Sequence, residues 1–323
     1  MSQDALQAPR PSHRLTRCTR RNMVRGLQME PFMLARALSL VPLTATAIIL
    51  AGCRSADRSA SSGAPQADAT VPPAAEGPAV LTVMARDFVF EAPAQVPAGM
   101  TTIRLLNHGP SLHHVQLFKL EDGKTVDDFM TALKSPGPLP QWVRAAGGPN
   151  PPEPGSATSI TEVLEPGNYV MVCFVPSADG MPHVMKGMMR PLTVTPGSGT
   201  AGSEPKADIT MKLVDFDFQS SQQLTPGRHT IRVENAGSQP HEVAFVKMKP
   251  GKTPQDFANW GMKPVGPAPG MTLGGVSAIM PGAYAFVDVD LPAGDYALLC
   301  FVPDAKDGKP HFAHGMAKLI KVG

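Results

Sequence analysis

Short hydrophobic runs alternate with polar and turn-forming residues along the chain after residue 78. Leu81–Met84 and Thr102–Leu106 have the length of strands, and Tyr169, Met171 and Cys173 recur at every second position. Side chains two residues apart lie on the same face of a strand, so this period predicts strands with one buried face. Many short strands with turn signals between them favour an all-β fold built from β-sandwiches.

Two short helices are predicted among these strands, one after Thr125 and one after Thr253. Threonine can cap the N-terminus of a helix, and an Asp stands three residues further on in both places. Pro254 also suits the first position of a helix. We therefore expect one short helix in each half of the chain.

The two halves of the chain are copies of one another. Four segments return 127 or 128 residues later: Asp87-Phe-Val-Phe90 as Asp215-Phe-Asp-Phe218, Asn107-His-Gly109 as Asn235-Ala-Gly237, Gly123-Lys-Thr125 as Gly251-Lys-Thr253, and Cys173-Phe-Val-Pro176 as Cys300-Phe-Val-Pro303. A repeat of this length predicts two tandem domains, over residues 79–197 and 207–323. A linker, residues 198–206, is expected between them.

Residues 1–53 resemble the signal segment of a bacterial lipoprotein. An uncharged run, Ala37–Ala51, follows an Arg-rich stretch, and as a helix it would rise about 22 Å, short of the ~30 Å hydrocarbon core of a membrane. Such a run is typical of a signal peptide, and Leu50-Ala51-Gly52-Cys53 resembles the lipobox. The resemblance implies a lipid on Cys53 and a membrane-anchored protein of the bacterial envelope, facing the periplasm. An ordinary signal peptide and a single anchor helix are the alternatives.

The rest of the N-terminal region predicts a tether. Residues 54–78 are rich in Ser, Ala, Pro and Gly and show no hydrophobic period, as in flexible linkers. Residues 1–36 contribute +5 to the formal net charge of +2, so a chain processed at Cys53 carries −3. A weakly acidic protein lacks the charge that binds nucleic acid. Met23, Met29 and Met33 are alternative start residues.

Four cysteines are present, and two of them belong to the repeat. Cys18 lies in the segment expected to be removed, and Cys53 is the expected lipidation site. Cys173 and Cys300 occupy equivalent positions, each without a second Cys in its own copy. Oxidising compartments favour disulfides, so an unpaired thiol there indicates another role, and metal ligation is a good one.

A repeated set of metal-ligand types surrounds each of these two cysteines. The order is Cys-x9-His-x3-Gly-Met in the first copy and Cys-x10-His-x3-Gly-Met in the second, with another His 60 or 59 residues before the Cys. The candidate ligands are His113, Cys173, His183 and Met188 in the first copy, and His241, Cys300, His311 and Met316 in the second. A thiolate, two imidazoles and a weak thioether are the ligands of type 1 copper, whereas structural zinc sites use four Cys or His ligands. His114 could replace His113, and Met185 or Met189 could replace Met188.

The ligand pattern resembles that of the cupredoxins, the superfamily of plastocyanin and azurin. The stretch Asn235-Ala-Gly-Ser-Gln-Pro-His241 is similar to the family's approach to its first His ligand. Gly294-Asp-Tyr296 followed by Cys300, His311 and Gly315-Met316 is similar to the family's copper loop, and the first copy repeats it. The resemblance implies two tandem Greek-key β-sandwiches, one type 1 copper ion in each copy, and one-electron transfer.

The sequence departs from the family pattern in three ways. The loop from Cys to His is longer than in plastocyanin and nearer to that of copper nitrite reductases. His114 and Glu242 occupy a position that is commonly Asn and that braces the copper site. Val172 and Leu299 precede the cysteines, where multicopper oxidases and copper nitrite reductases place a His that leads to a second copper site. We therefore expect a protein without enzymatic activity.

These observations lead to one main functional expectation and two alternatives. The main expectation is one-electron transfer through two copper sites, with redox proteins of the envelope as partners. The first alternative is copper storage or delivery through the same ligands, with copper-handling proteins as partners. The second is an interaction module without metal, in which each Cys is a small core residue.

Overall fold

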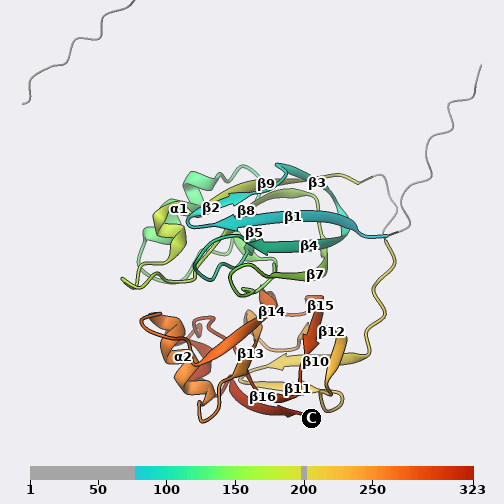
Figure 1. Ribbon diagram of the computed structural model, residues 1–323. Helices are drawn as coiled ribbons and strands as arrows, with labels where there is room; N and C mark the ends of the chain where they lie inside the picture. Colours follow the sequence, from blue (N-terminus) through green and yellow to red (C-terminus); the bar gives the residue numbers. More distant parts are fainter. Residues whose placement is uncertain (1–76, 198–201) are drawn as a thin grey trace, which may run out of the picture. The chain divides into compact units, whose positions relative to one another are not determined.

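The structure, a computed structural model, describes residues 77–197 and 202–323 (Figure 1). The predicted signal segment with Cys53, the tether up to residue 76 and residues 198–201 of the predicted linker lie outside these ranges. Among the described residues, no helix combines the length and the apolar character needed to cross a membrane. The described chain is built mainly of strands, with two α-helices and two short 3₁₀ helices.

The first copy contains two layers of strands. The first layer has the order β2-β1-β4-β7, with β1 and β4 parallel. The second has the order β3-β9-β8-β5-β6. The strands are β1 (Ala79–Arg86), β2 (Val89–Glu91), β3 (Gln95–Pro97), β4 (Gly99–Asn107), β5 (Gln116–Leu120), β6 (Val143–Ala145), β7 (Ala157–Leu164), β8 (Gly167–Val172) and β9 (Met189–Thr195).

The second copy repeats this arrangement. Its first layer has the order β11-β10-β12-β15, with β10 and β12 parallel, and its second layer has the order β14-β13-β16-β17. The strands are β10 (Ile209–Val214), β11 (Asp217–Ser220), β12 (Gly227–Asn235), β13 (His241–Met248), β14 (Gly270–Ile279), β15 (Tyr284–Leu291), β16 (Gly294–Leu299) and β17 (Ala317–Val322). The prediction of an all-β fold with two similar sandwiches is confirmed.

Each copy carries the predicted helix, α1 (Val126–Lys134) or α2 (Pro254–Met262). Thr125 caps α1 and accepts the N–H of Asp128 at 3.1 Å, while the Asp128 carboxylate accepts the N–H of Thr125 at 2.9 Å. Thr253 and Asp256 form the same reciprocal pair at α2. These capping boxes satisfy backbone donors that the first turn leaves free, and the prediction of two short helices is confirmed.

The central strand of the second layer in the first copy, β8, has buried residues on both faces. In β8, Tyr169 and Met171 belong to the core between the two layers, as their period predicts. Val170 and Val172 are also buried, in a second cluster that contains Phe129 of α1. The period of two in the sequence predicted one buried face. The other face is buried as well because α1, which comes from a separate segment of the chain, packs against it.

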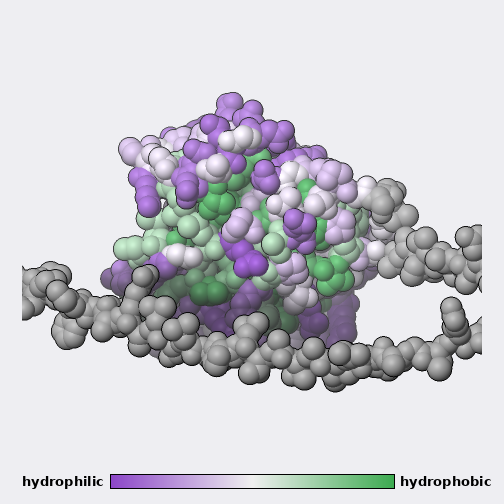
Figure 2. All heavy atoms as spheres, turned by 90° about the horizontal axis from the view of Figure 1, so that it is seen from above, coloured by the Kyte–Doolittle hydropathy of each residue, from purple (hydrophilic) through white to green (hydrophobic). Residues whose placement is uncertain are grey.

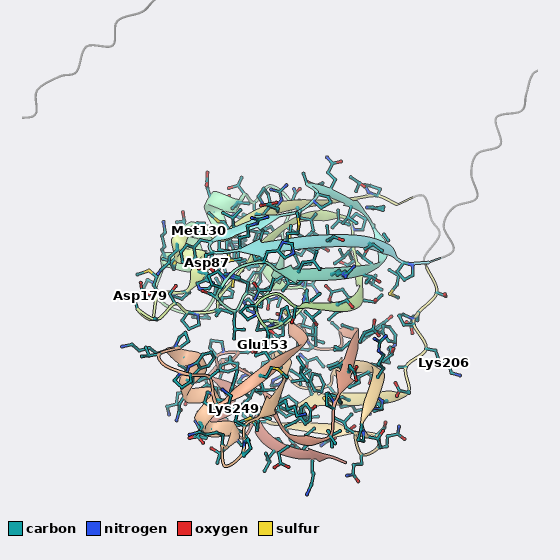
Figure 3. The ribbon with its side chains drawn as sticks, in the orientation of Figure 1. Asp87, Met130, Glu153, Asp179, Lys206 and Lys249 are labelled. Atoms are coloured by element: carbon teal, nitrogen blue, oxygen red, sulfur yellow. The ribbon has the colours of Figure 1, made fainter. Side chains whose placement is uncertain are left out.

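The two copies are joined edge to edge. Strands β7 and β15 pair antiparallel, with Ile160 opposite Val287, so that the two first layers form one eight-stranded sheet (Figure 1). Residues 146–152 form bridges with β14 at three further positions. Glu153, between the copies in Figure 3, accepts the N–H of Thr272 at 2.7 Å. Although a linker is expected between the two copies in the sequence, backbone hydrogen bonds connect them directly in the structure.

Hydrophobic residues also reach the surface of the described residues. Figure 2 shows them as patches between hydrophilic residues on the face that is seen from above. The exposed large hydrophobic side chains include Val80, Val89, Met181 and Met185. Apolar atoms contribute much of the surface of any folded protein, so these patches alone assign no partner.

Candidate metal centres

A buried Asn fixes the loop before each predicted first His ligand. Asn107 Nδ2 donates to the carbonyl oxygen of Ser111 at 2.9 Å, and Asn235 Nδ2 donates to that of Gln239 at 2.9 Å. The side-chain oxygen of each Asn accepts the N–H two residues further on. Because both loops have the same internal hydrogen bonds, they place His113 and His241 in the same position of the two copies.

A glycine leaves room for each of these imidazole rings. A Cβ atom on Gly109 would lie 2.6 Å from His113 Nε2, and a Cβ atom on Gly237 would lie 2.6 Å from His241 Nε2. Both distances are shorter than any ordinary carbon–nitrogen contact, so a larger residue would displace the ring. The repeated Asn-x-Gly motif is therefore explained by the position of the His that follows it.

Centre 1 is defined by His113, Cys173, His183 and Met188. Cys173 directly follows β8, and His183 begins the 3₁₀ helix His183–Lys186. His113 Nδ1 lies 3.1 Å from His183 Nδ1, and Cys173 Sγ lies 3.6 Å from His183 Nδ1. The ligand atoms of these three buried residues all lie within 4.8 Å of one another. The structure thus brings together three side chains that are up to 70 residues apart in the chain.

Centre 2 is defined by His241, Cys300, His311 and Met316. His241 begins β13, Cys300 follows β16, and His311 begins the 3₁₀ helix His311–His314. Cys300 Sγ lies 3.4 Å from His311 Nδ1, and the rings of His241 and His311 have centroids 4.6 Å apart. The ligand atoms of the three again lie within 4.8 Å of one another. The two copies therefore have the same arrangement.

The two methionines lie at the end of the same loops. Met188 and Met316 are fully buried. Met188 donates its N–H to the carbonyl oxygen of His183 at 3.0 Å and accepts the N–H of Cys173 at 3.2 Å. Met185 is 40% exposed and points out of the core. These contacts favour Met188 over Met185, while metal binding by either residue stays a prediction.

The position of His114 separates it from centre 1. Its Nε2 accepts the N–H of Phe174 at 2.8 Å, whereas His113 Nδ1 faces His183. The structure therefore favours His113 as the ligand and gives His114 a bracing role. Glu242 occupies the equivalent position in the second copy, and its Oε1 accepts the N–H of Phe301 at 2.7 Å. We call His114 and Glu242 the braces.

The repeated Asp-Phe pair contacts both imidazoles, a role that the sequence analysis missed. Asp87 Oδ1 lies 2.9 Å from His113 Nε2, and the Phe88 ring meets the His183 ring edge-on at a centroid distance of 5.1 Å. Asp215 and Phe216 do the same for His241 and His311. Figure 3 shows Asp87 at the same end of the first copy as Asp179, which lies in the loop between Cys173 and His183. The repetition of this pair in the sequence was the signal that could have identified it.

Each Asp fixes which ring nitrogen faces the centre. When a carboxylate accepts a hydrogen bond from the Nε2–H of a neutral imidazole, Nδ1 is the ring nitrogen that carries no proton and can bind a metal ion. In His241, Nδ1 is buried without a hydrogen-bond partner among the described residues. Buried polar atoms normally have a partner, and a metal ion would supply one here. The residues of centre 2 therefore fit a metal ion that takes nitrogen and sulfur ligands.

Burial sets the protonation of both centres. It raises the pKa of the Cys173 thiol to about 12 and that of Cys300 well above its usual value. It lowers the pKa of His183 and of His311 to about 4. The rings of His183 and His311 are therefore neutral at neutral pH and ready to bind metal, while each thiol must release its proton when a metal ion binds.

A third group of possible ligands lies at the surface near centre 2. Asp304, Asp307 and His314 have ligand atoms within 4.8 Å of one another. The carboxylate of Asp304 already accepts hydrogen bonds from Gln239 and from two backbone N–H groups of its own loop. These bonds account for the cluster as part of the loop structure.

Comparisons with known proteins find a likeness only to solved structures. No protein-family model matches the chain, and no curated protein sequence matches it. Among solved structures, auracyanin A, a "blue" copper protein from Chloroflexus aurantiacus, is 18% identical with a TM-score of 0.27, and the match covers 37% of this chain and 100% of that protein. A multicopper oxidase is 11% identical (TM-score 0.21; 76% of this chain and 88% of the oxidase). The Cu-containing nitrite reductase from Thermus scotoductus SA-01 is 12% identical (TM-score 0.20; 76% of this chain and 61% of the reductase). The all-β fold of this chain is established by its own strands and sheets.

One expectation from the sequence is contradicted. The absence of a His before Cys173 and Cys300 led us to expect a protein without enzymatic activity. Several structures that match about three quarters of the chain are named as oxidases or as a nitrite reductase, which are enzymes. The exclusion relied on one position in each copy, and we withdraw it.

Proposed function

We propose that the chain binds one copper ion in each centre as type 1 copper and passes single electrons to and from other proteins. The observation that carries the proposal is the repeated convergence of two imidazole nitrogens and one thiol, all buried, in centre 1 and centre 2. Soft thiolate and imidazole ligands select copper, and the axial thioether is typical of type 1 sites. The copper proteins among the similar structures support the same choice of metal.

The protein supplies the geometry that such a site needs. When bound, copper would supply a one-electron couple between Cu(I) and Cu(II). His113, Cys173 and His183 are held by separate strands and loops, with backbone hydrogen bonds closing the loop from Cys173 to Met188. A site that is fixed in this way resists rearrangement when the charge of the metal changes. Burial also keeps water away from the thiolate.

We further propose that a lipid on Cys53 anchors the protein to a membrane of the bacterial envelope, with the two centres facing the periplasm. The sequence Leu50-Ala51-Gly52-Cys53 after an apolar run supports this proposal. Its partners would be redox proteins or copper-handling proteins of the envelope. Mass determination of the protein extracted from bacterial membranes tests it, because the proposal requires an N-terminal acylated Cys53.

Absorption spectroscopy tests the copper sites directly. The sample is the full-length chain with Cys18→Ser and Cys53→Ser, so that only the two centre thiols can bind, after addition of Cu(II) and removal of the excess. We expect a strong visible thiolate-to-copper band and two copper ions per chain. Cys173→Ala and Cys300→Ala should each remove one ion and about half of the band. A protein that retains no copper and shows no band would contradict the proposal.

Copper storage or delivery is a second candidate, and the surface of the first copy favours it. Met181 is 46% exposed and Met185 is 40% exposed, both in or beside the loop that carries His183. Exposed thioethers are soft ligands that favour Cu(I). In the experiment above, retention of Cu(I) without a visible Cu(II) band would select this function. The double variant Met181→Leu, Met185→Leu should then take up Cu(I) more slowly than the unchanged chain.

A further inference from the structure

Each brace is bonded to the backbone directly after a predicted cysteine ligand. His114 Nε2 accepts the N–H of Phe174, and Glu242 Oε1 accepts the N–H of Phe301. Each brace is also the next residue after a predicted His ligand, His113 or His241. A brace therefore connects two ligands of its own centre.

Two buried side chains lie between the braces. Ser277 Oγ lies 3.5 Å from His114 Nδ1 and donates to Asn150 Oδ1 at 3.0 Å. Asn150 Nδ2 donates at 3.0 Å to the carbonyl oxygen of Val243, the residue that follows the second brace. Asn150 is 2% exposed and Ser277 is fully buried. Because water has little access, these bonds persist and polarise one another more than surface bonds do.

Asn150 and Ser277 occupy equivalent positions in the two copies. Each follows a Gly-Gly pair by two residues, Gly147-Gly148 in the first copy and Gly274-Gly275 in the second. A Cβ on Gly148 would lie 2.2 Å from the carbonyl oxygen of Val115, and one on Gly275 would lie 2.0 Å from that of Val243. The glycines thus permit a close approach within each copy, between the Gly-Gly segment and the residue that follows the brace. Across the copies, Asn150 donates its N–H to the carbonyl oxygen of Gly275 and Ser277 donates its N–H to that of Gly148, so each segment meets its own counterpart.

We propose that Asn150 and Ser277 couple the two centres, so that a copper ion bound at one centre raises the affinity of the other centre for copper. The inference rests on the proposed binding of copper at both centres. An ion at centre 1 would hold Cys173 and the next peptide, that of Phe174, in place. It would thereby also hold His114, the brace that accepts the N–H of this peptide. Ser277 and Asn150 connect that brace to the backbone beside the second brace, which becomes positioned for its own ion. Such coupling must act equally in both directions.

Competition titration with a copper chelator of known affinity measures the coupling. The full-length chain with Cys18→Ser and Cys53→Ser is titrated, together with the same chain carrying Cys173→Ala or Cys300→Ala, which leaves one centre. The coupling factor is the product of the two binding constants of the intact chain divided by the product of the two single-centre constants. We expect a factor of about five or more.

Two variants test the connection itself. Ser277→Ala removes one hydroxyl and leaves the bond from Asn150 to Val243, and Asn150→Leu removes the whole connection. We expect both to bring the factor close to one and to leave the single-centre constants near their original values. If Asn150→Leu does not fold, the coupling factor measured with Ser277→Ala tests the connection.

Gln116→Met is the matched control. Gln116 is also a buried amide between the copies, and its Nε2 donates to the carbonyl oxygen of Ala278 at 3.0 Å, but its side-chain amide donates to backbone carbonyl oxygens and not to a brace. This variant should keep the coupling factor. A factor that falls equally in Gln116→Met would overturn the inference, because any loss at the interface would then suffice.

The outcomes separate this inference from the proposed function. Two bound ions with a factor of one in the intact chain, or a factor that Ser277→Ala and Asn150→Leu leave unchanged, would overturn the coupling alone. A chain that binds no copper would overturn the proposed function and the coupling together. A factor below one would also contradict the proposal, which requires the second ion to bind more tightly.

Discussion

The two centres have the same inner residues but different braces. A neutral imidazole, His114, accepts the N–H of Phe174 at 2.8 Å, whereas a carboxyl group, Glu242, accepts that of Phe301 at 2.7 Å. Both side chains reach the same backbone position after the Cys. The comparison teaches that this position needs a buried hydrogen-bond acceptor of sufficient length, and that its chemical type can change.

Burial acts on the two braces in opposite directions. It lowers the pKa of His114 to about 4 and raises the pKa of Glu242 to about 7. In each case burial disfavours the charged form, which is the acid form of His and the base form of Glu. The two copies should therefore respond differently to pH although their folds are alike.

The loops that carry the second His differ as well. Met181 and Met185 of the first copy correspond to Lys309 and Ala313 of the second. The first copy thus presents thioethers near its centre, and the second copy presents a charge. If the chain exchanges Cu(I) with a partner, we expect the exchange at the first copy, where the thioethers are exposed.

The largest expected effect concerns what the two centres share. Each buried thiol is protonated at neutral pH and must release one proton to the solvent when copper binds, while His183 and His311 are already neutral above about pH 4. The copper affinity of each centre should therefore rise about tenfold per pH unit, or about a thousandfold from pH 5 to pH 8. Chelator competition across this range, with the single-centre variants, measures it. An affinity that does not change with pH would contradict a protonated thiol.

The second prediction concerns the braces in the metal-free protein. The pKa of Glu242 is higher in the folded chain than its ordinary value of 4.5, so its contribution to stability is complete below about pH 4.5 and is lost as the pH rises through about 7. The loss is about 3 kcal/mol. Glu242→Gln should remove this part of the pH dependence of the free energy of unfolding, measured by urea denaturation at pH 4.5 and pH 8.

His114→Gln is the matched control for that experiment. The folded pKa of His114 is lowered, so its contribution is complete above about pH 6.5 and is lost as the pH falls through about 4. In this variant the free energy of unfolding should fall less steeply as the pH drops below 6.5, and its dependence on pH between 6.5 and 8 should be unchanged. If the free energy of unfolding depended on pH in the same way in both variants, the pKa values of the two braces would not be shifted in opposite directions.

The third prediction concerns the Asp residues that orient the first His. Asp87→Asn in a chain with Cys300→Ala, and Asp215→Asn in a chain with Cys173→Ala, should each lower the copper affinity of the remaining centre by about 10- to 100-fold. The reason is that an amide oxygen accepts the hydrogen bond from Nε2–H more weakly than a carboxylate does. The ring is then held less firmly with Nδ1 directed at the centre. Chelator competition at one pH measures both. Unchanged affinity in either variant would remove the orienting role.

The smallest expected effect concerns the helix caps. Thr125→Ala and Thr253→Ala should each lower the free energy of unfolding by about 1 kcal/mol, because each removes the acceptor for one N–H of the first helical turn. Urea denaturation of the two variants should give equal losses within error. A clear difference would show that the two helices are not equivalent in the folded protein.

Local patterns explain why part of the fold could be predicted. A capping box needs only Thr125 and Asp128, three residues apart, so the start of α1 was readable from the sequence. The candidate ligands were found because one loop carries three of them at a repeated spacing. The roles of Asp87 and Phe88 were not found, since these residues lie 26 or more positions before the rings they contact and only the folded strands bring them there.

By itself, the sequence determined the all-β class, the two copies, the capped helices and the groups of Cys, His and Met, because each of these depends on residues that are close in the chain or repeated along it. The tertiary structure alone decided that β7 pairs with β15, that His114 accepts the N–H of Phe174, and that Asn150 meets Ser277 between the two braces. The physical reason is that these contacts join strand edges and loops from distant segments. Which edge pairs with which, and which side chain is buried between them, depends on the packing of the whole chain.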